Sequence, residues 1–364
     1  MPARAKRQAS IDLDNRASYQ HLDPRGMLDF ATNFPGQLRD AARIGRSFRP
    51  PDGLRNPKHI VVAGMGGSAA AGDLVACLCV PHLRVPMLVS RDYRIPRFVG
   101  RETLFIASSH SGNTEETFAA TGLAVRRKAG VVCITTGGKL RDLALRHRLP
   151  LIQTPSDPPM PPRAALGYSL MPLIFVLSSL GLYPGAAQQV REAIALSEGM
   201  SDEFHPDVPA ERNLAKQLAH HFFGRIPWVQ STAGLMSAAA YRWRCQFNEN
   251  SKMLAYSSEY PELNHNEIVG WELDPRLARN LAPVVLREQS VPERILARID
   301  ITRDLLDGKA EIRVIDVIAD SPLSRAIYAV YLADFVTIYL AFLNGVDPAA
   351  IYGIEELKRR LARL

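Results

Sequence analysis

The chain has 364 residues, which is enough for two α/β domains or one large one. Its 47% apolar and 22% charged residues are typical of a soluble globular protein. The formal net charge is +7, but the basic residues are spread along the chain apart from short clusters at 126–128 and 358–360. We therefore expect no nucleic-acid partner, because such partners are bound by clustered basic surfaces.

The cysteines and the apolar segments limit the cellular context. The four cysteines lie at positions 77, 79, 133 and 245 and form no CxxC pair and no metal-binding pattern. No apolar stretch is long enough to span a membrane without interruption, and no apolar segment of the secretory type follows the basic N-terminus. We expect a cytoplasmic protein with reduced thiols and no membrane contact.

The first half of the chain alternates between two kinds of pattern. Residues 1–24 are polar and are predicted to form an N-terminal arm, and a helical pattern follows over 25–45. Strand-like runs are then expected at 58–63, 86–90, 103–108, 130–135 and 149–153, with helices at 68–80, 114–129 and 139–147. This alternation predicts an α/β fold of the doubly wound, flavodoxin-like kind, with a parallel sheet covered by helices on both faces.

The second half repeats the alternation after a break. A proline-rich segment at 155–162 precedes an apolar helix expected at about 164–181, and the polar stretch 201–210 is predicted to be a linker. The first domain would then cover 25–200 and the second 211–364. Further strands are expected at 227–231, 252–257, 282–287 and 312–318, and helices at 234–248, 291–306, 322–344 and about 355–363.

Two strand-to-helix turns carry glycine and hydroxyl residues. Gly64-Met65-Gly66-Gly67-Ser68 follows the run 59–63, and Ser108 to Thr114 follows 103–107. Backbone N–H groups and hydroxyls at such helix N-termini bind phosphate, and ligands of open α/β sheets lie at the carboxyl ends of the strands. The predicted phosphate-binding residues are Gly67, Ser68, Ser109, Ser111 and Thr114.

Each of these turns, taken alone, could equally be a simple turn with a helix cap. A dinucleotide fingerprint is absent, because Ala69 stands where GxGxxG needs its third glycine, and no Walker A loop occurs.

Several motifs resemble one family of sugar isomerases. Gly-Gly-Ser at 66–68, followed by the Ser-rich motif at 109–117, resembles the sugar isomerase (SIS) domain. Asn-Glu-Asn-Ser-Lys at 248–252 and Pro-Glu-Leu-Asn-His-Asn-Glu at 261–267 resemble the bifunctional phosphoglucose/phosphomannose isomerases, as does the C-terminal segment 347–358. The resemblance runs from about residue 25 to the C-terminus. It implies two SIS-type subdomains and an aldose–ketose isomerase that needs no cofactor and no metal.

The resemblance also implies roles for four residues. An enediol isomerase must open the sugar ring, move a proton between C2 and C1 and stabilise an enediolate. Glu249 resembles the proton-shuttling base, Arg163 the enediolate-stabilising cation, and His265 and Lys358 the ring-opening groups. His265 would come from the neighbouring subunit of a homodimer. From the residues alone, Glu249, His265 and Lys358 could each be a solvated surface group.

The expected reaction converts glucose 6-phosphate to fructose 6-phosphate, with mannose 6-phosphate as a second substrate, because the two aldoses share one enediol. Two alternatives stay open. The chain could be a sugar-phosphate sensor, although the first 45 residues are too short for a DNA-binding helix-turn-helix, or a binding partner without catalysis. The stretch 271–309 looks longer than the family core needs.

Overall fold

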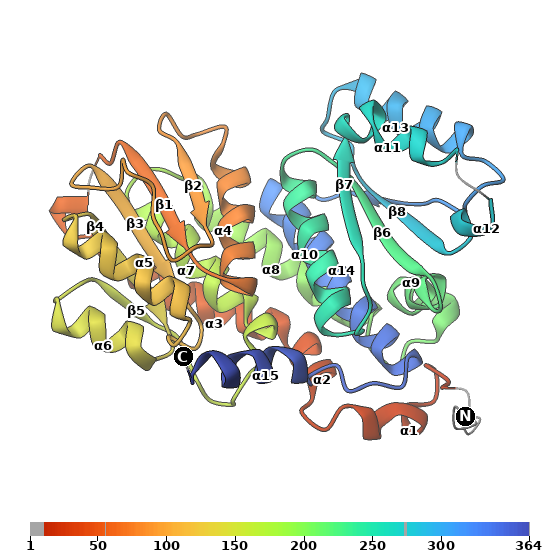
Figure 1. The fold of residues 1–364 in the computed structure, drawn as a ribbon, viewed down its shortest axis with the longest axis horizontal. Coiled ribbons are helices and arrows are strands. Elements are labelled where there is room, and N and C mark those ends of the chain that lie inside the picture. The colour runs from red at the N-terminus through yellow and green to blue at the C-terminus, as the bar shows by residue number, and fades with distance from the viewer. Residues whose placement is uncertain (1–10, 55, 273–274, 364) are drawn as a thin grey trace.

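Two parallel sheets stand side by side in the computed structural model, which describes residues 11–54, 56–272 and 275–363 (Figure 1). The first sheet has the strand order β2-β1-β3-β4-β5, which is the order of the flavodoxin-like fold, and the second has the order β7-β6-β8-β9. All pairings between neighbouring strands are parallel. The strands are β1 (His59–Ala63), β2 (Met87–Ser90), β3 (Thr103–Ser108), β4 (Gly130–Thr135), β5 (Leu151–Gln153), β6 (Ile226–Thr232), β7 (Tyr256–Tyr260), β8 (Leu281–Glu288) and β9 (Arg313–Val317).

Helices cover both sheets and fill the space between them (Figure 1). They are α1 (Arg16–Tyr19), α2 (Met27–Thr32), α3 (Phe34–Arg46), α4 (Gly66–Cys79), α5 (Glu115–Arg126), α6 (Gly138–Arg146), α7 (Leu166–Ser179), α8 (Ala186–Glu203), α9 (Leu214–Phe222), α10 (Leu235–Glu249), α11 (Glu267–Gly270), α12 (Pro275–Ala278), α13 (Glu293–Leu305), α14 (Pro322–Leu343) and α15 (Tyr352–Leu361). Short 3₁₀ turns include η3 (Pro162–Ala164) and η5 (Glu262–His265).

The predicted doubly wound α/β architecture is confirmed in both halves. The sequence misplaced β7, which begins at Tyr256 and not at Lys252, because the apolar run 253–255 looks like a strand. Lys252 has a φ of 57°, which lies in the left-handed region and does not fit a strand. Helices α8 and α9 were not predicted from the sequence.

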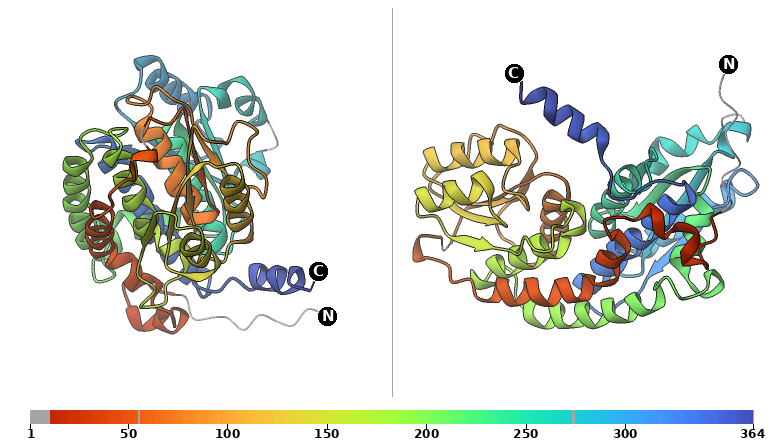
Figure 2. Two further views of the ribbon diagram at one scale, coloured as in Figure 1. Left: turned by 90° about the vertical axis from the view of Figure 1, so that its left-hand side faces the viewer. Right: turned by 90° about the horizontal axis from the view of Figure 1, so that it is seen from below.

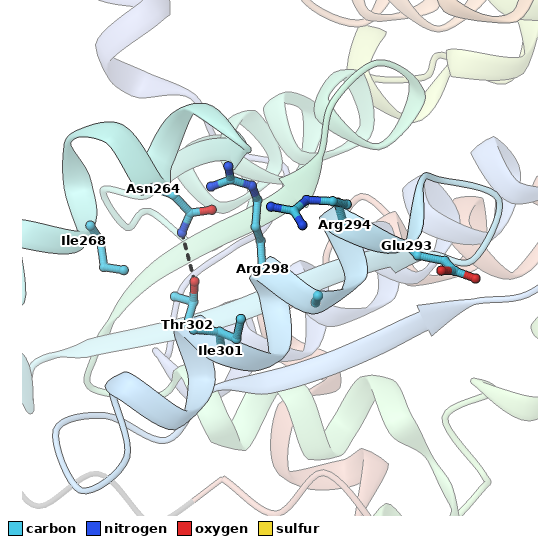
Figure 3. Close-up of a pocket in the computed structure, with 8 residues that line it drawn as sticks. Asn264, Ile268, Glu293, Arg294, Arg298, Ile301 and Thr302 are labelled. Atoms are coloured by element: carbon cyan, nitrogen blue, oxygen red, sulfur yellow. Dashed lines mark hydrogen bonds between the residues drawn. The ribbon is translucent and has the colours of Figure 1, made fainter.

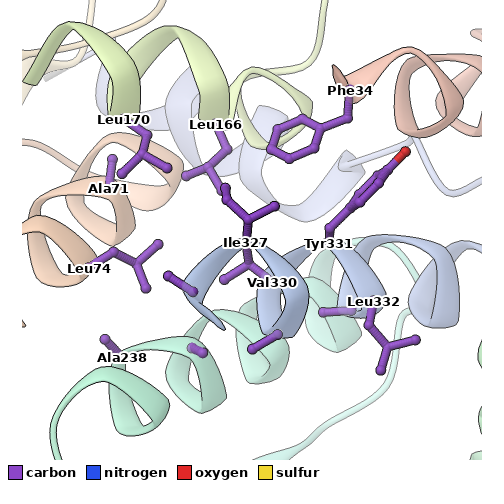
Figure 4. Packing of buried hydrophobic residues seen from close by; sticks show 14 of the residues in the cluster. Phe34, Ala71, Leu74, Leu166, Leu170, Ala238, Ile327, Val330, Tyr331 and Leu332 are labelled. Carbon is purple, nitrogen blue, oxygen red and sulfur yellow. The ribbon is translucent and has the colours of Figure 1, made fainter. Parts of the chain in front are cut away.

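A single hydrophobic cluster joins the two halves, and α14 lies at its centre. Figure 4 shows Ile327, Val330 and Tyr331 of this helix among residues of α3, α4, α7 and α10. A helix that is apolar on every side packs on every side, which explains its place between the sheets. By length and composition α14 could cross a membrane, but 89% of its most apolar window is buried inside the fold, as in a core helix.

From residue 11 onward, the segment predicted to be a polar N-terminal arm packs on the fold, and residues 1–10 lie outside the described part. Leu13 and Tyr19 are buried, and the Tyr19 ring stacks on Phe342 at 4.6 Å between ring centroids. Asp14 accepts a hydrogen bond of 2.9 Å from the buried Lys216. The polar residues of this segment therefore face solvent while its few apolar side chains extend the core.

The predicted linker 201–210 is continuous with the core. Its first residues complete α8, and Phe204 is buried against Phe335 of α14. The division of the chain into a first domain at 25–200 and a second at 211–364 stays a proposal.

Helix α15 projects away from the body, as both views of Figure 2 show. None of its residues is buried.

Candidate active site

The two predicted phosphate loops lie side by side, because β1 and β3 are neighbours in the first sheet. The hydroxyl oxygens of Ser109 and Thr114 are 2.9 Å apart, and Ser109 is buried. Ser68, in the first turn of α4, is also buried, and its hydroxyl lies 3.2 Å from that of Ser169. Ser111 is exposed at the tip of the second loop. The structure therefore gathers these hydroxyls at one edge of the sheet, where two helices begin.

Gly112 lets the second loop fold tightly. Its φ is 67°, and a Cβ atom there would lie 1.7 Å from the carbonyl oxygen of Gly137. We expect Gly112→Ala to distort the loop and to raise KM for a sugar phosphate about tenfold, with a smaller change in kcat. Gly181→Ala is the matched control, because Gly181 also has a positive φ but has open space around its Cβ position. Equal KM values in the two variants would contradict a role of this loop in substrate binding.

Arg163 and Glu249 are far apart in sequence and form an ion pair between the two sheets. Arg163 lies in η3 and is 4% exposed, and one of its terminal nitrogens is 3.6 Å from a carboxylate oxygen of Glu249, the last residue of α10. Burial lowers the pKa of Arg163, while Glu249 and Asp347 raise it. A buried guanidinium beside a partly exposed carboxylate is a suitable pair for holding and deprotonating a polar substrate.

The Arg163 side chain is fixed by further hydrogen bonds. Its Nε donates to Oδ1 of Asn250 at 2.7 Å, and a terminal nitrogen donates to the carbonyl oxygen of Pro348. Asn250 is itself buried and donates to the hydroxyl of Thr337 in α14 at 3.0 Å. The orientation of the guanidinium is therefore set by groups from three separate segments of the chain.

The first phosphate loop adjoins this ion pair. A Cβ atom on Gly67 would lie 3.1 Å from the carbonyl oxygen of Pro162 and 3.6 Å from Cα of Arg163. A side chain at this position would crowd η3, so the glycine favours this close approach of α4. The structure thus places Gly67 and Ser68, at the start of α4, next to the turn that carries Arg163, the ion-pair partner of Glu249.

Two predicted residues are not brought to this place within one chain. His265 is exposed at the end of η5, which follows the carboxyl end of β7, whereas Glu249 precedes the start of that strand (Figure 1). Lys358 is exposed on the projecting helix α15 (Figure 2). Glu267, two residues after His265, has a buried carboxylate oxygen without a hydrogen-bond partner among the described residues.

A separate hollow lies between η5, α11 and α13 (Figure 3). Its volume is about 630 Å³, and Arg294, Arg298 and Ile301 contribute to its lining. Asn264 at its edge donates a hydrogen bond of 2.9 Å to Thr302. This hollow adjoins the turn that carries His265 and holds none of the other predicted site residues. Among residues 11–54, 56–272 and 275–363, no cluster of three or more His, Cys, Asp or Glu side chains could hold a metal ion.

Comparisons with known proteins identify the family of this chain. The family described as "Bacterial phospho-glucose isomerase C-terminal SIS domain" matches residues 211–361. A bifunctional phosphoglucose/phosphomannose isomerase of Caldicellulosiruptor bescii is 37% identical over 339 residues, which cover 93% of this chain and 99% of the relative. The chain belongs to the family of bifunctional phosphoglucose/phosphomannose isomerases.

A second member of this family, from Thermoplasma acidophilum, is 33% identical and matches over 89% of this chain and 95% of its own. Among solved structures, a hypothetical protein of Thermus thermophilus superposes with a TM-score of 0.73 at 16% identity, over 93% of this chain and 90% of that one. At such low identity the superposition supports the fold alone.

Sequence reasoning missed the residues that support the site. The motif that contains Asn250 does not indicate its hydrogen bond with Arg163, and no local pattern indicates that Arg242 pairs with Asp334. Arg242 donates to Asp334 at 2.9 Å and to the carbonyl oxygen of Arg163 at 3.1 Å. The sequence offered one signal for this pair: Arg242 lies on the buried side of the amphipathic helix α10, and Asp334 lies within the largely apolar helix α14. Charged side chains in such places are seldom buried without a partner.

Proposed function

We propose that this protein is an aldose–ketose isomerase that interconverts glucose 6-phosphate and mannose 6-phosphate with fructose 6-phosphate. Its family membership supports this reaction class. The observation that carries the proposal is the Arg163–Glu249 pair, held at 3.6 Å beside the glycine and hydroxyl loops of the first sheet. An anionic sugar anchored by its phosphate in those loops would present its other end to the carboxylate.

The residues can supply the steps of an enediol mechanism. The Ser109 and Thr114 hydroxyls and the helix N-termini would hold the phosphate. The carboxylate of Glu249 would take the proton from C2 of the open aldose and return it to C1. The electrons move onto the carbonyl oxygen O1, and the buried charge of Arg163 would stabilise the resulting enediolate; a proton passes from O2 to O1 before C1 is protonated, which leaves the carbonyl at C2. Because the enediol has no stereocentre at C2, one base can serve both aldoses.

Ring opening is assigned to His265 and Lys358, and we propose that a second copy of the chain completes the site. The exposed position of His265, away from Glu249 of its own chain, supports this arrangement. A two-fold dimer would exchange the two His265 turns between its sites.

Mixing two inactive variants tests the shared site. In a mixed dimer of Glu249→Gln and His265→Ala chains, one of the two sites regains both wild-type residues. We expect activity to recover to roughly a quarter of the wild-type value after random exchange of subunits in this symmetric dimer. No recovery, with exchange verified by mass spectrometry, would place both residues in one chain.

Coupled assays of the wild-type protein with glucose 6-phosphate and with mannose 6-phosphate test the reaction itself. Turnover of both sugars supports the proposal. Tight binding of these sugars without turnover would favour the sensor instead. We further propose a cytoplasmic location, as the sequence predicts.

A further inference from the structure

Lys252 stands out because it is an exposed lysine whose ammonium group is nonetheless hydrogen-bonded to the fold, and because its backbone is strained shortly after the candidate base. Its φ of 57° lies in a region that side-chain-bearing residues seldom adopt, and such strain often marks functional sites. Lys252 lies three residues after Glu249, at the point where the chain leaves α10. The short turn brings its side chain back toward the end of that helix.

The ammonium group of Lys252 is held by three carbonyl oxygens. It donates to the carbonyl of Glu249 at 2.6 Å, of Asn250 at 3.2 Å and of Pro348 at 3.3 Å. The first two belong to the C-terminal end of α10, where carbonyl groups lack helical partners and a cation is favoured. An ammonium has three N–H donors, so its donors match the three acceptors.

The third acceptor connects Lys252 with the enediolate-stabilising candidate. The carbonyl oxygen of Pro348 also accepts a hydrogen bond from Arg163. Lys252 and Arg163 thus hold the same carbonyl of the loop between α14 and α15, from the second and the first half of the chain. This loop leads directly to the helix that carries Lys358.

We infer that Lys252 is a positioning residue: its charged ammonium locks the end of α10 onto the Pro348 loop and thereby keeps the Glu249 carboxylate aligned with Arg163. The inference rests on the proposed function for its kinetic consequences. Lys252 does not reach the substrate in this arrangement, because all three of its donors point to main-chain oxygens.

The lock depends on the charge of Lys252, and its surroundings make that charge labile. Burial and the nearby Arg163 lower the pKa of Lys252 to about 8, and only Asp347 and Glu249 oppose them. Arg163 faces Lys252 from η3, Asp347 from the Pro348 loop and Glu249 from α10. A neutral amine has two N–H donors and a lone pair, so one of the three carbonyl contacts becomes repulsive.

The pH dependence of the isomerase reaction tests the inference. We expect kcat of the wild type to fall as the pH rises through about 8. Lys252→Arg keeps a permanent charge with several donors, so this decline should disappear or move to higher pH while most activity remains. Lys252→Met should lower kcat about tenfold at neutral pH, change KM little and show no decline near this pH. A wild-type decline that persists unchanged in both variants would overturn the inference.

The free energy of unfolding is a second measurement, and it should change with pH in the direction opposite to activity. The folded protein releases the Lys252 proton near pH 8 and the unfolded chain near 10.5, so this residue raises the free energy of unfolding as the pH rises between these values. Activity should fall over the same range. Lys128→Met is the matched control, since Lys128 is exposed and also has a positive φ, of 63°. It should leave both pH profiles unchanged.

Amide hydrogen exchange separates this inference from the proposed function. If the wild type turns over neither sugar, the proposed function fails, and Lys252 is then tested by exchange of the amides at 246–251. The lock predicts faster exchange in Lys252→Met than in the wild type at neutral pH. Equal protection in the two proteins would refute it.

Discussion

Replacing Glu249 with glutamine should lower kcat for both sugar phosphates by about 10²–10⁴-fold, because the neutral amide cannot accept the C2 proton. The substitution keeps the shape of the side chain, and the phosphate loops lie on other elements. We therefore expect KM to change by less than about threefold, since phosphate anchoring is retained. Steady-state kinetics with glucose 6-phosphate and with mannose 6-phosphate measure both constants.

The fold should tolerate this change. The Glu249 side chain is 28% exposed, and in the variant Arg163 keeps its hydrogen bonds to Asn250 and to the carbonyl of Pro348. Glu203→Gln is the matched control, because Glu203 is the last residue of α8 as Glu249 is of α10. Equal kcat in Glu249→Gln and Glu203→Gln would show that Glu249 is not the base.

Replacing Arg242 with methionine should lower the free energy of unfolding by about 3–5 kcal/mol, because it leaves the buried carboxylate of Asp334 without its charged partner. Arg242 is 2% exposed and donates to both oxygens of Asp334, at 2.9 and 3.2 Å. Burial raises the pKa of Asp334, and Arg242 and Gln246 hold it down. Chemical denaturation at pH 7 measures the loss.

The double variant Arg242→Met/Asp334→Leu shows whether the cost comes from the unpaired charge. Replacing both members of a buried pair with apolar groups of similar size is often nearly neutral, so most of the lost stability should return. A double variant as unstable as Arg242→Met alone would attribute the loss to packing. Arg242 also donates to the carbonyl of Arg163, and both variants lack this hydrogen bond. We therefore expect kcat of the double variant to be below the wild-type value even where its stability recovers.

The sequence was sufficient for the parts of this molecule that local patterns encode. The strands β1 to β5 and the helices between them were predicted because apolar runs alternate with amphipathic ones in a regular rhythm. The glycine and hydroxyl loops were recognised because their chemistry lies within ten contiguous residues. The approach of Gly67 to η3 depends on a pairing of distant segments, which no local pattern contains.

The missed elements have physical causes that lie outside any single segment. The sequence of α8 mixes polar and small residues, so its helical pattern is weak, although the helix packs along α14. The first described residues look like a polar arm, but Leu13 and Tyr19 are buried, and Tyr19 stacks on Phe342, which is hundreds of residues away. Lys252 looked unremarkable in the sequence because its role comes from three carbonyl oxygens, two local and one nearly a hundred residues distant.

The central claim is that the hydroxyl loops and the Arg163–Glu249 pair act on one and the same sugar phosphate. A crystal structure with arabinonate 5-phosphate, whose carboxylate imitates the enediolate, tests it most directly. We predict the phosphate at the hydroxyls of Ser109 and Thr114 and the carboxylate within hydrogen-bonding distance of Arg163, with Glu249 facing the carbon next to it. A phosphate bound in these loops with the carboxylate end turned away from Arg163 would contradict the account.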